Sequence, residues 1–503
     1  MLYFSTRDTS ASPKTVSAAE AVKEGLAPDG GLYLPVSVPR LKREDFSALC
    51  AMEYAERTAR LLSLFFEEYD RDLLLADCRE AYSAARFPRA RIPASFGERP
   101  APLCPLKDGV YALELWHGPT SAFKDMALQI MPRLLSRAFR LTGEKRLAHI
   151  LVATSGDTGK AALEGYRDVD GVKITVFYPT GGVSPMQARQ MQTTRGGNVN
   201  AVAVRGNFDD AQNGVKKIFS DRALAEKADR EGFFFSSANS INWGRLAPQI
   251  AYYVSAYCDL INAGKISMGD PVNVAVPTGN FGNIFAAYLA REAGLPVSRL
   301  ICASNRNDVL TEFVRTGVYD RRREFHKTVS PSMDILISSN LERLLCFLGG
   351  PELTRDLMGA LSRDGVYRAP ESLMEKIRAV FSGYSLGEDE TLAVIGKTWA
   401  EEGYLTDPHT AVGYGAVRKY REETGDSLPV ILASTASPFK FAAPVSRAIG
   451  LEADEGGLYD GLKKLAAFTG WEIPAPLADT ETLPLRFERV IDPRDMASVP
   501  FGG

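Results

Sequence analysis

The segment Glu114-Leu-Trp-His-Gly-Pro-Thr-Ser-Ala-Phe-Lys-Asp125 decides the fold, because it joins a strand-like run to a helical pattern and places one lysine at the junction. Residues 111–115 alternate as a strand does, and apolar residues recur at helical spacing from Met126 to Leu135. A lysine at the start of a helix faces unpaired N–H groups, which disfavour its protonated form. Lys124 is therefore a candidate for a neutral amine that forms a Schiff base with a carbonyl compound. The alternative is a solvated lysine in the first turn of the helix.

The pattern of strand, glycine turn and helix repeats along the rest of the chain. Further predicted strands are residues 147–153, 172–178, 200–204, 272–276 and 429–433. Apolar strands that alternate with helices predict an α/β fold with parallel sheets covered by helices on both faces. Ligands of such sheets bind at the carboxyl ends of the strands, where the glycine turns lie.

Changes in this pattern divide the chain into an N-terminal α-rich unit, a large α/β domain that binds the ligand, and a smaller, mobile α/β subdomain. The predicted bounds are 1–100 for the N-terminal unit, 101–144 together with 266–503 for the large domain, and 145–265 for the smaller subdomain. A proline-rich connection marks the first boundary.

Composition excludes several classes of protein. The 503 residues include 59 basic and 62 acidic side chains, a net charge of -3, which argues against a general nucleic-acid binder. Six cysteines without a CxxC pair, with only four histidines, predict neither a zinc cluster nor a disulfide framework, and no metal site. Such cysteine usage is typical of the cytoplasm. No run is apolar enough to predict membrane insertion or a secretion signal.

The turn Gly279-Asn-Phe-Gly-Asn283 follows a predicted strand and opens a predicted helix. Glycines let a backbone approach a ligand closely, and the N–H groups at a helix start point at a bound phosphate. The sequence therefore predicts an anion cradle here, with a purely structural turn as the alternative.

Two more segments offer groups for a second anion. Thr154-Ser-Gly-Asp-Thr-Gly159 again joins a strand to a helix and carries hydroxyls and free N–H groups, but its spacing is too short for a nucleotide-binding P-loop. Asn239-Ser-Ile-Asn-Trp-Gly-Arg245 combines amide, hydroxyl and guanidinium groups, which suit a phosphate or carboxylate. An ordinary helix cap at Ser240 or Asn242 is the alternative.

A third turn, Ala433-Ser-Thr-Ala-Ser-Pro-Phe-Lys-Phe441, also follows a predicted strand, and Pro438 is expected to begin a helix. The Thr435 hydroxyl is a neutral group that suits a ring nitrogen.

Together these segments resemble the threonine synthases, pyridoxal-phosphate enzymes of the tryptophan-synthase β fold, and specifically their longer-chain branch. The resemblance extends from residue 16 to about residue 445 and so covers most of the chain. The segments that carry it are Val16-Ser17, Gly25–Pro35, His117–Asp125, Ala153–Gly159, Tyr178-Pro179 with Ser184-Pro185, Ser237–Asn242, Gly279–Asn283 and Asp407–Val412.

The resemblance implies a role for each matched residue. Lys124 would hold pyridoxal 5'-phosphate as an internal aldimine, Asp157 would lie near the ring hydroxyl, and Thr435 would face the pyridine nitrogen. The residues implied to bind the cofactor phosphate are Gly279, Asn280, Phe281, Gly282 and Asn283. Those implied to receive the phosphate or carboxylate of the substrate are Thr154, Ser155, Ser240, Asn242 and Arg245.

One departure from the family pattern concerns the third turn, which usually reads Thr-Ala-His-Pro. This chain has Ser437 in place of that histidine, and a serine cannot act as an imidazole. His409 does match the family pattern, either as a functional residue or as one that packs and hydrogen-bonds within the fold.

The implied reaction converts O-phospho-L-homoserine and water to L-threonine and phosphate through a Lys124 Schiff base, the last step of threonine biosynthesis. The chain would then be a carbon-oxygen lyase acting on phosphates, with a small molecule as its partner. A phospho-lyase or deaminase acting on phosphothreonine, threonine or serine is the alternative on the same fold. A non-catalytic protein that binds pyridoxal phosphate or phosphate is a second alternative. The sequence does not predict an oligomeric state.

Overall fold

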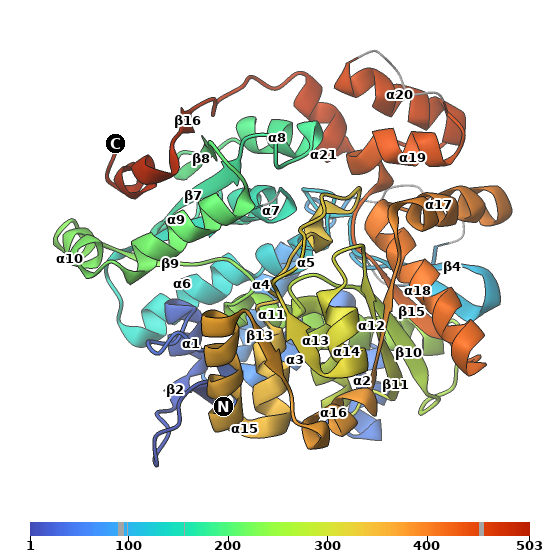
Figure 1. Ribbon diagram of the computed structural model, residues 1–503, viewed down its shortest axis with the longest axis horizontal. Coiled ribbons are helices and arrows are strands. Elements are labelled where there is room, and N and C mark those ends of the chain that lie inside the picture. Colours follow the sequence, from blue (N-terminus) through green and yellow to red (C-terminus); the bar gives the residue numbers. More distant parts are fainter. Residues whose placement is uncertain (89–94, 98, 155, 452–456, 503) are drawn as a thin grey trace.

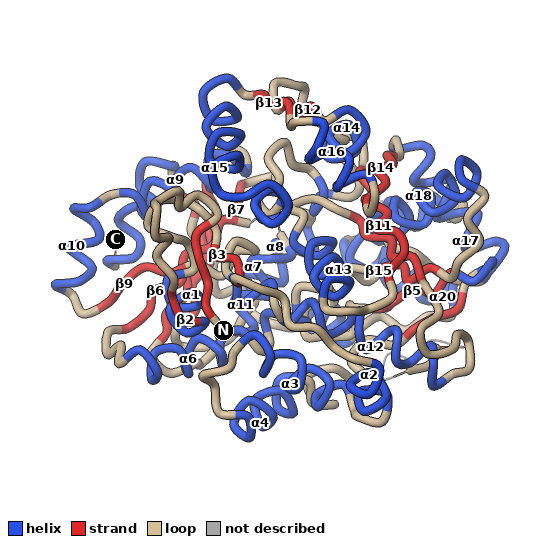
Figure 2. Tube along the Cα trace, turned by 90° about the horizontal axis from the view of Figure 1, so that it is seen from below, coloured by secondary structure: helices blue, strands red, loops and turns tan. Residues whose placement is uncertain are grey.

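The computed structural model describes residues 1–88, 95–97, 99–154, 156–451 and 457–502. Two parallel sheets lie in separate lobes, one around β7 and β8 and the other around β10, β11 and β15 (Figure 1). The view from below also separates β6 and β9 from β11, β15 and β5 (Figure 2). This arrangement confirms the predicted α/β fold with two subdomains.

The large sheet has six strands in the order β14, β11, β10, β15, β5, β4. Their bounds are β14 (Phe381–Ser385), β11 (Val297–Ser304), β10 (Val272–Pro277), β15 (Val430–Ser434), β5 (Val110–Glu114) and β4 (Leu103–Pro105). All neighbours run parallel except β4, which is antiparallel to β5.

Helices cover both faces of the large sheet. Successive side chains of β10 point to opposite faces, so that Val274 joins the core that contains Ile284 of α13 (Gly282–Glu292). Ala275 joins a different core, which contains Val417 of α18 (Pro408–Thr424). The near-continuous apolar sequence of the strand follows from burial on both sides.

The smaller sheet has five parallel strands in the order β16, β8, β7, β6, β9. Their bounds are β16 (Val490–Ile491), β8 (Val199–Val204), β7 (Val172–Pro179), β6 (Leu147–Ala153) and β9 (Phe233–Ser236). The helices that follow these strands are α7 (Asp157–Tyr166), α8 (Pro185–Gln192), α9 (Phe208–Ser220) and α10 (Arg222–Arg230).

The N-terminal unit contains the predicted helices together with a small sheet. Its helices are α1 (Ala18–Glu24), α2 (Arg43–Cys50), α3 (Tyr54–Phe65) and α4 (Arg71–Ala81). Ser17 and Glu20 form a capping box at the start of α1. The prediction of an α-rich unit omits three short antiparallel strands, β1 (Leu2–Ser5), β2 (Val16–Ser17) and β3 (Tyr33–Pro35).

Two segments lie outside the domains expected for them. Helix α12 (Pro248–Asn262) falls within the predicted bounds of the smaller subdomain, but it packs against α2, α3 and α13. It is buried on nearly every face, as befits a helix between two layers. The end of the chain falls within the predicted bounds of the large domain, but β16 extends the smaller sheet beside β8. A two-residue strand has too little sequence to show a period.

A helix that crosses a bilayer must be both long and apolar, and no helix among the described residues is long and apolar enough.

A buried ion pair joins the N-terminal unit to α12. Arg57 Nη1 lies 2.6 Å from Asp259 Oδ1 and 2.8 Å from Ser255 Oγ. Both charged side chains are at most 2% exposed. A charged side chain that is buried this deeply is stable only beside a group of opposite charge.

We expect Asp259→Ala to lower the free energy of unfolding by about 3–5 kcal/mol, because it leaves the Arg57 guanidinium buried without a counter-charge. The control is Glu226→Ala, which breaks an exposed pair with Arg222 and should cost less than about 0.5 kcal/mol. Urea unfolding followed by circular dichroism measures both. Equal midpoints for the two variants would contradict this role of the buried pair.

Candidate functional site

Three neighbouring strands of the large sheet bring the predicted turns together. Strands β10, β15 and β5 lie side by side and run parallel, so their carboxyl ends share one edge. The turn at Gly279 follows β10, Thr435 follows β15, and the Lys124 segment follows β5. A hydrogen bond from Phe123 N to Thr435 O, of 2.8 Å, holds the last two segments against each other.

Lys124 is buried beside polar groups from two other segments. Its Nζ lies 3.5 Å from Asp157 Oδ2 and donates to Ser332 Oγ at 3.3 Å. Burial lowers the pKa of Lys124 to about 8, and the positive charges of Arg245 and Lys440 act in the same direction, whereas Asp157 opposes them. The direction agrees with the sequence argument, but the main cause is burial, because the helix that begins here is only one turn long.

The Asp157 carboxylate stands at the start of α7, between two ammonium groups. Its Oδ1 lies 2.6 Å from Lys440 Nζ and accepts a hydrogen bond of 2.9 Å from Gln187 Nε2. Burial raises the pKa of Asp157, but Lys440 and Lys124 outweigh burial and hold this pKa well below its usual range. Asp157 therefore remains ionised over the whole neutral range.

The turn from Gly279 to Asn283 has the features of a phosphate cradle. Phe281 has a φ of 61°, and no N–H group of the turn donates to an acceptor in the described part of the chain. Asn283 Oδ1 accepts hydrogen bonds of 2.5 Å from the hydroxyls of Tyr252 and Tyr253. Its Nδ2 is buried and has no partner among the described residues. A buried amide donor and free N–H groups suit the phosphate of pyridoxal phosphate.

Gly279 packs closely against the segment that contains Ser332. A Cβ at this position would come within 2.8 Å of the Ser332 carbonyl oxygen. Any larger residue would displace the cradle or that segment, so the glycine is required by close approach.

Arg245 is the charged member of the predicted substrate site. Its guanidinium donates to Ala238 O at 2.8 Å and to Thr158 Oγ1 at 3.4 Å, and burial lowers its pKa to about 10. Even so, it is cationic at neutral pH. Its charge also acts on Lys124, which places the guanidinium within electrostatic range of the amine.

Two other predicted substrate residues use their polar atoms within the protein. Asn242 caps the helix at Gly244 N and donates to Val22 O at 2.9 Å. Thr154 Oγ1 accepts from Gly156 N and from Gly159 N, both at 2.9 Å. In this structure both side chains therefore order the turns around the site.

The remaining predicted substrate residues are two serines. Ser240 is half-buried and its Oγ accepts from Asn340 Nδ2 at 3.2 Å. Ser155 lies outside the described residues.

Sequence reasoning missed Ser332, which lies in the weakly patterned region between residues 316 and 390. Its Oγ contacts Lys124 and donates to Asp157 Oδ2 at 3.3 Å, and its N–H donates to His409 Nε2 at 3.2 Å. His409 Nδ1 lies 2.7 Å from Asp407 Oδ1, which fixes the Nδ1–H tautomer and leaves Nε2 as an acceptor. A chain of hydrogen bonds thus connects Asp407 to the Lys124 amine.

Ser437 is fully buried and acts as a cap. Its Oγ accepts from Phe439 N at 3.4 Å, and its N–H donates to Ser121 O at 3.1 Å. Pro438 begins a short 3-10 helix, η3 (Pro438–Phe441), where the sequence predicted a helix.

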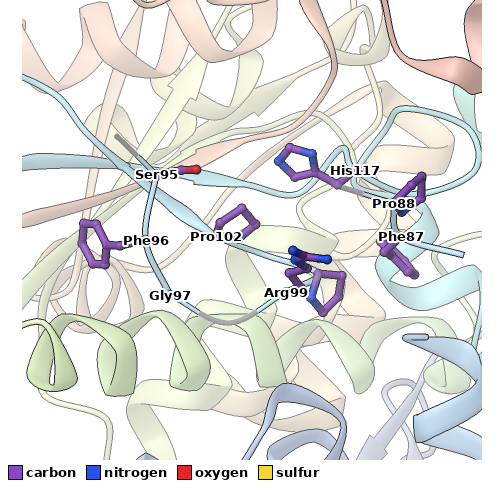
Figure 3. A pocket seen from close by; sticks show the side chains of 9 residues that line it. Phe87, Pro88, Ser95, Phe96, Gly97, Arg99, Pro102 and His117 are labelled. Carbon is purple, nitrogen blue, oxygen red and sulfur yellow. The ribbon is translucent and has the colours of Figure 1, made fainter. Parts of the chain in front are cut away.

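A separate cavity of about 40 Å³ lies beside the connection between the N-terminal unit and the large domain (Figure 3). Its lining residues are Phe87, Pro88, Ser95, Phe96, Gly97, Arg99, Pro100, Pro102 and His117. None of them belongs to the predicted site, so this cavity adds nothing to the groups around Lys124.

Three family models match the chain in sequence. The threonine synthase N terminus matches residues 2–82, the pyridoxal-phosphate dependent enzyme family matches residues 94–435, and the threonine synthase C-terminal family matches residues 410–499. This chain belongs to the threonine synthase family. The finding confirms the resemblance noted in the sequence and the cofactor it implied, pyridoxal phosphate.

Individual relatives agree with this assignment. Threonine synthase from Pseudomonas aeruginosa is 38% identical over 89% of this chain and 90% of its own length. Human threonine synthase-like 1 is 40% identical over 86% of this chain, but the match covers only 58% of the human protein. The structure of PLP-bound threonine synthase from Brucella melitensis is 37% identical, with a TM-score of 0.84 over 98% of this chain and 97% of that one.

We expect Asn283→Asp to weaken the binding of pyridoxal phosphate about 100-fold, because a carboxylate oxygen replaces the free donor while Oδ1 still accepts from the two tyrosines. Asn207→Asp is the control and should cost less than about fivefold, since it adds the same charge to an exposed side chain of the smaller subdomain, where the carboxylate can still cap α9. Fluorescence titration of the cofactor gives both Kd values. Equal losses would contradict a direct contact by Nδ2.

Proposed function

We propose that this chain is a threonine synthase that converts O-phospho-L-homoserine and water to L-threonine and phosphate. The observation that carries the proposal is the buried amine of Lys124, whose pKa is lowered to about 8, beside a free phosphate cradle and the Arg245 guanidinium. A nucleophilic amine with two anion-binding groups fits a phosphorylated amino acid and a phosphorylated cofactor. Family membership supports the same class of reaction.

The residues of the large domain would hold the cofactor, which supplies the electron sink for the reaction. We assign its phosphate to the turn from Gly279 to Asn283, its covalent attachment to Lys124, and its ring nitrogen to the Thr435 hydroxyl. That hydroxyl makes no hydrogen bond among the described residues and is free to do so. Asp157 would lie near the ring hydroxyl.

Proton transfer would fall to Lys124 once its amine is free. The amine would remove the proton from the substrate Cα and then move protons at Cβ and Cγ while phosphate leaves from Cγ. A group whose pKa lies near the working pH can both accept and return a proton. Ser332, fixed by His409, would aim the amine at these carbons.

Arg245 is the residue we assign to the phosphate or carboxylate of the substrate, because it is the cation of the predicted set. Ser240 and Ser155 would add hydroxyls. Asn242 and Thr154 would act by ordering the turns that carry Arg245 and Asp157.

Incubation with pyridoxal phosphate and O-phosphohomoserine, followed by separate assays of threonine, 2-oxobutyrate and phosphate, tests this function. We expect threonine and phosphate in equal amounts, and we expect Lys124→Ala to lower turnover by at least about 10³-fold. Arg322→Ala is a control that should leave turnover unchanged, because the Arg322 side chain is exposed. Production of 2-oxobutyrate alone would favour the phospho-lyase or deaminase alternative, which Ser437 keeps open.

We expect Ser332→Ala and His409→Gln each to lower kcat about tenfold, with a smaller effect on KM. The double variant should lose no more than the worse single variant, because His409 acts through Ser332. His326→Gln is the control, because His326 makes no contact with Lys124 or Ser332 among the contacts of the described residues. Additive losses in the double variant would contradict the connection between His409 and Ser332.

A further inference from the structure

A second lysine, Lys440, is buried in the same site. It lies in η3, directly after the turn that carries Thr435, and its side chain is 0% exposed. Its Nζ lies 2.6 Å from Asp157 Oδ1 and donates to Thr120 O at 3.0 Å. Lysine is rarely buried without a counter-charge, because removing an ammonium group from water is costly. Asp157 provides that counter-charge.

The geometry divides the Asp157 carboxylate between two amines. Oδ1 faces Lys440, and Oδ2 faces Lys124 at 3.5 Å. The carbonyl of Thr120, which Lys440 also contacts, belongs to the segment that presents Lys124. Lys440 therefore touches both the carboxylate beside the reactive amine and the backbone that leads to it.

We propose that Lys440 is a positioning residue of the Lys124 site, which fixes one oxygen of Asp157, turns the other toward Lys124, and places a positive charge that disfavours protonation of the Lys124 amine. This inference rests on the proposed role of Lys124 but not on the identity of the product.

The charged groups around Lys124 come from several elements. Asp157 on α7 raises the Lys124 pKa, whereas Arg245 on α11 (Trp243–Leu246) and Lys440 on η3 lower it. Ser332 is neutral and connects the amine to His409. Loss of the Lys440 charge has two effects on the protonated Lys124 amine. It removes the repulsion between the two ammonium groups, and it leaves Lys124 as the one lysine that pairs with the Asp157 carboxylate. The Lys124 pKa must then rise.

The test compares three variants of the full chain. Lys440→Gln removes the positive charge but can still donate a hydrogen bond to Thr120 O. Lys440→Met removes the charge and this hydrogen bond, and Lys440→Arg keeps the charge. Lys160→Met is the matched control, because Lys160 is also buried and lies on α7 but pairs with Glu164 and Thr194. The rate of reductive methylation at Lys124, followed against pH by peptide mass spectrometry without cofactor, gives its pKa. The visible absorbance of the chain loaded with pyridoxal phosphate, titrated with pH, gives a second readout.

We expect the glutamine and methionine variants to raise the Lys124 pKa by about one unit, and the arginine variant and the control to leave it unchanged. An unchanged pKa in the glutamine variant would overturn the proposal, and so would an arginine variant that shifts as far as glutamine does. The glutamine variant decides the question if the methionine variant does not fold. Methylation needs no substrate, so a chain that makes no threonine but shows the expected shift would contradict the proposed function and leave this inference standing.

Discussion

The carboxylate of Asp157, held between the buried ammonium groups of Lys124 and Lys440, is the interaction on which the site depends. Asp157 comes from the helix after β6 of the smaller sheet, whereas both lysines follow strands of the large sheet. The ion pairs therefore connect the two lobes across the site. Each charge is too deeply buried to be stable alone, so the three groups fix one another and fix the distance between the lobes. The lowered Lys124 pKa is a consequence of this arrangement, because burial and two neighbouring cations outweigh one shared carboxylate.

Sheet topology explains how residues more than 300 positions apart meet. Because β10, β15 and β5 are adjacent and parallel, their carboxyl ends deliver the cradle at Gly279, Thr435 and Lys124 to one edge. Backbone hydrogen bonds then set the final positions, as between Phe123 and Thr435. The smaller sheet adds Asp157 from the facing lobe. Neither sheet holds a complete site, which is why the fold needs both.

The sequence predicts the parts of this fold that rest on local pattern. The runs at residues 147–153 and 272–276 are apolar except for His149 and Asn273, and they match β6 and β10 closely. Strand β14 contains two serines and a glycine, and β11 contains two serines and an arginine, so neither has the uniform character that marks a buried strand. Within the site, strand ends and glycine turns point to Lys124 and to the cradle. Ser332 and Lys440 have no such signal, because their roles arise only from contacts between segments distant in sequence.

The contacts around the third turn show what the serine at position 437 changes relative to the family histidine. Thr435 is held through its backbone, by Phe123 N on its carbonyl and by Thr410 Oγ1 on its N–H, and neither bond involves the side chain at position 437. Ser437 itself is held by its N–H on Ser121 O and by its own cap to Phe439. A serine in place of the family histidine therefore leaves the placement of Thr435 and of the η3 turn with Lys440 intact. The serine lacks the imidazole ring of the family histidine and is smaller. The substitution therefore affects whatever group occupies the space next to the third turn, and it does not affect the attachment of the cofactor.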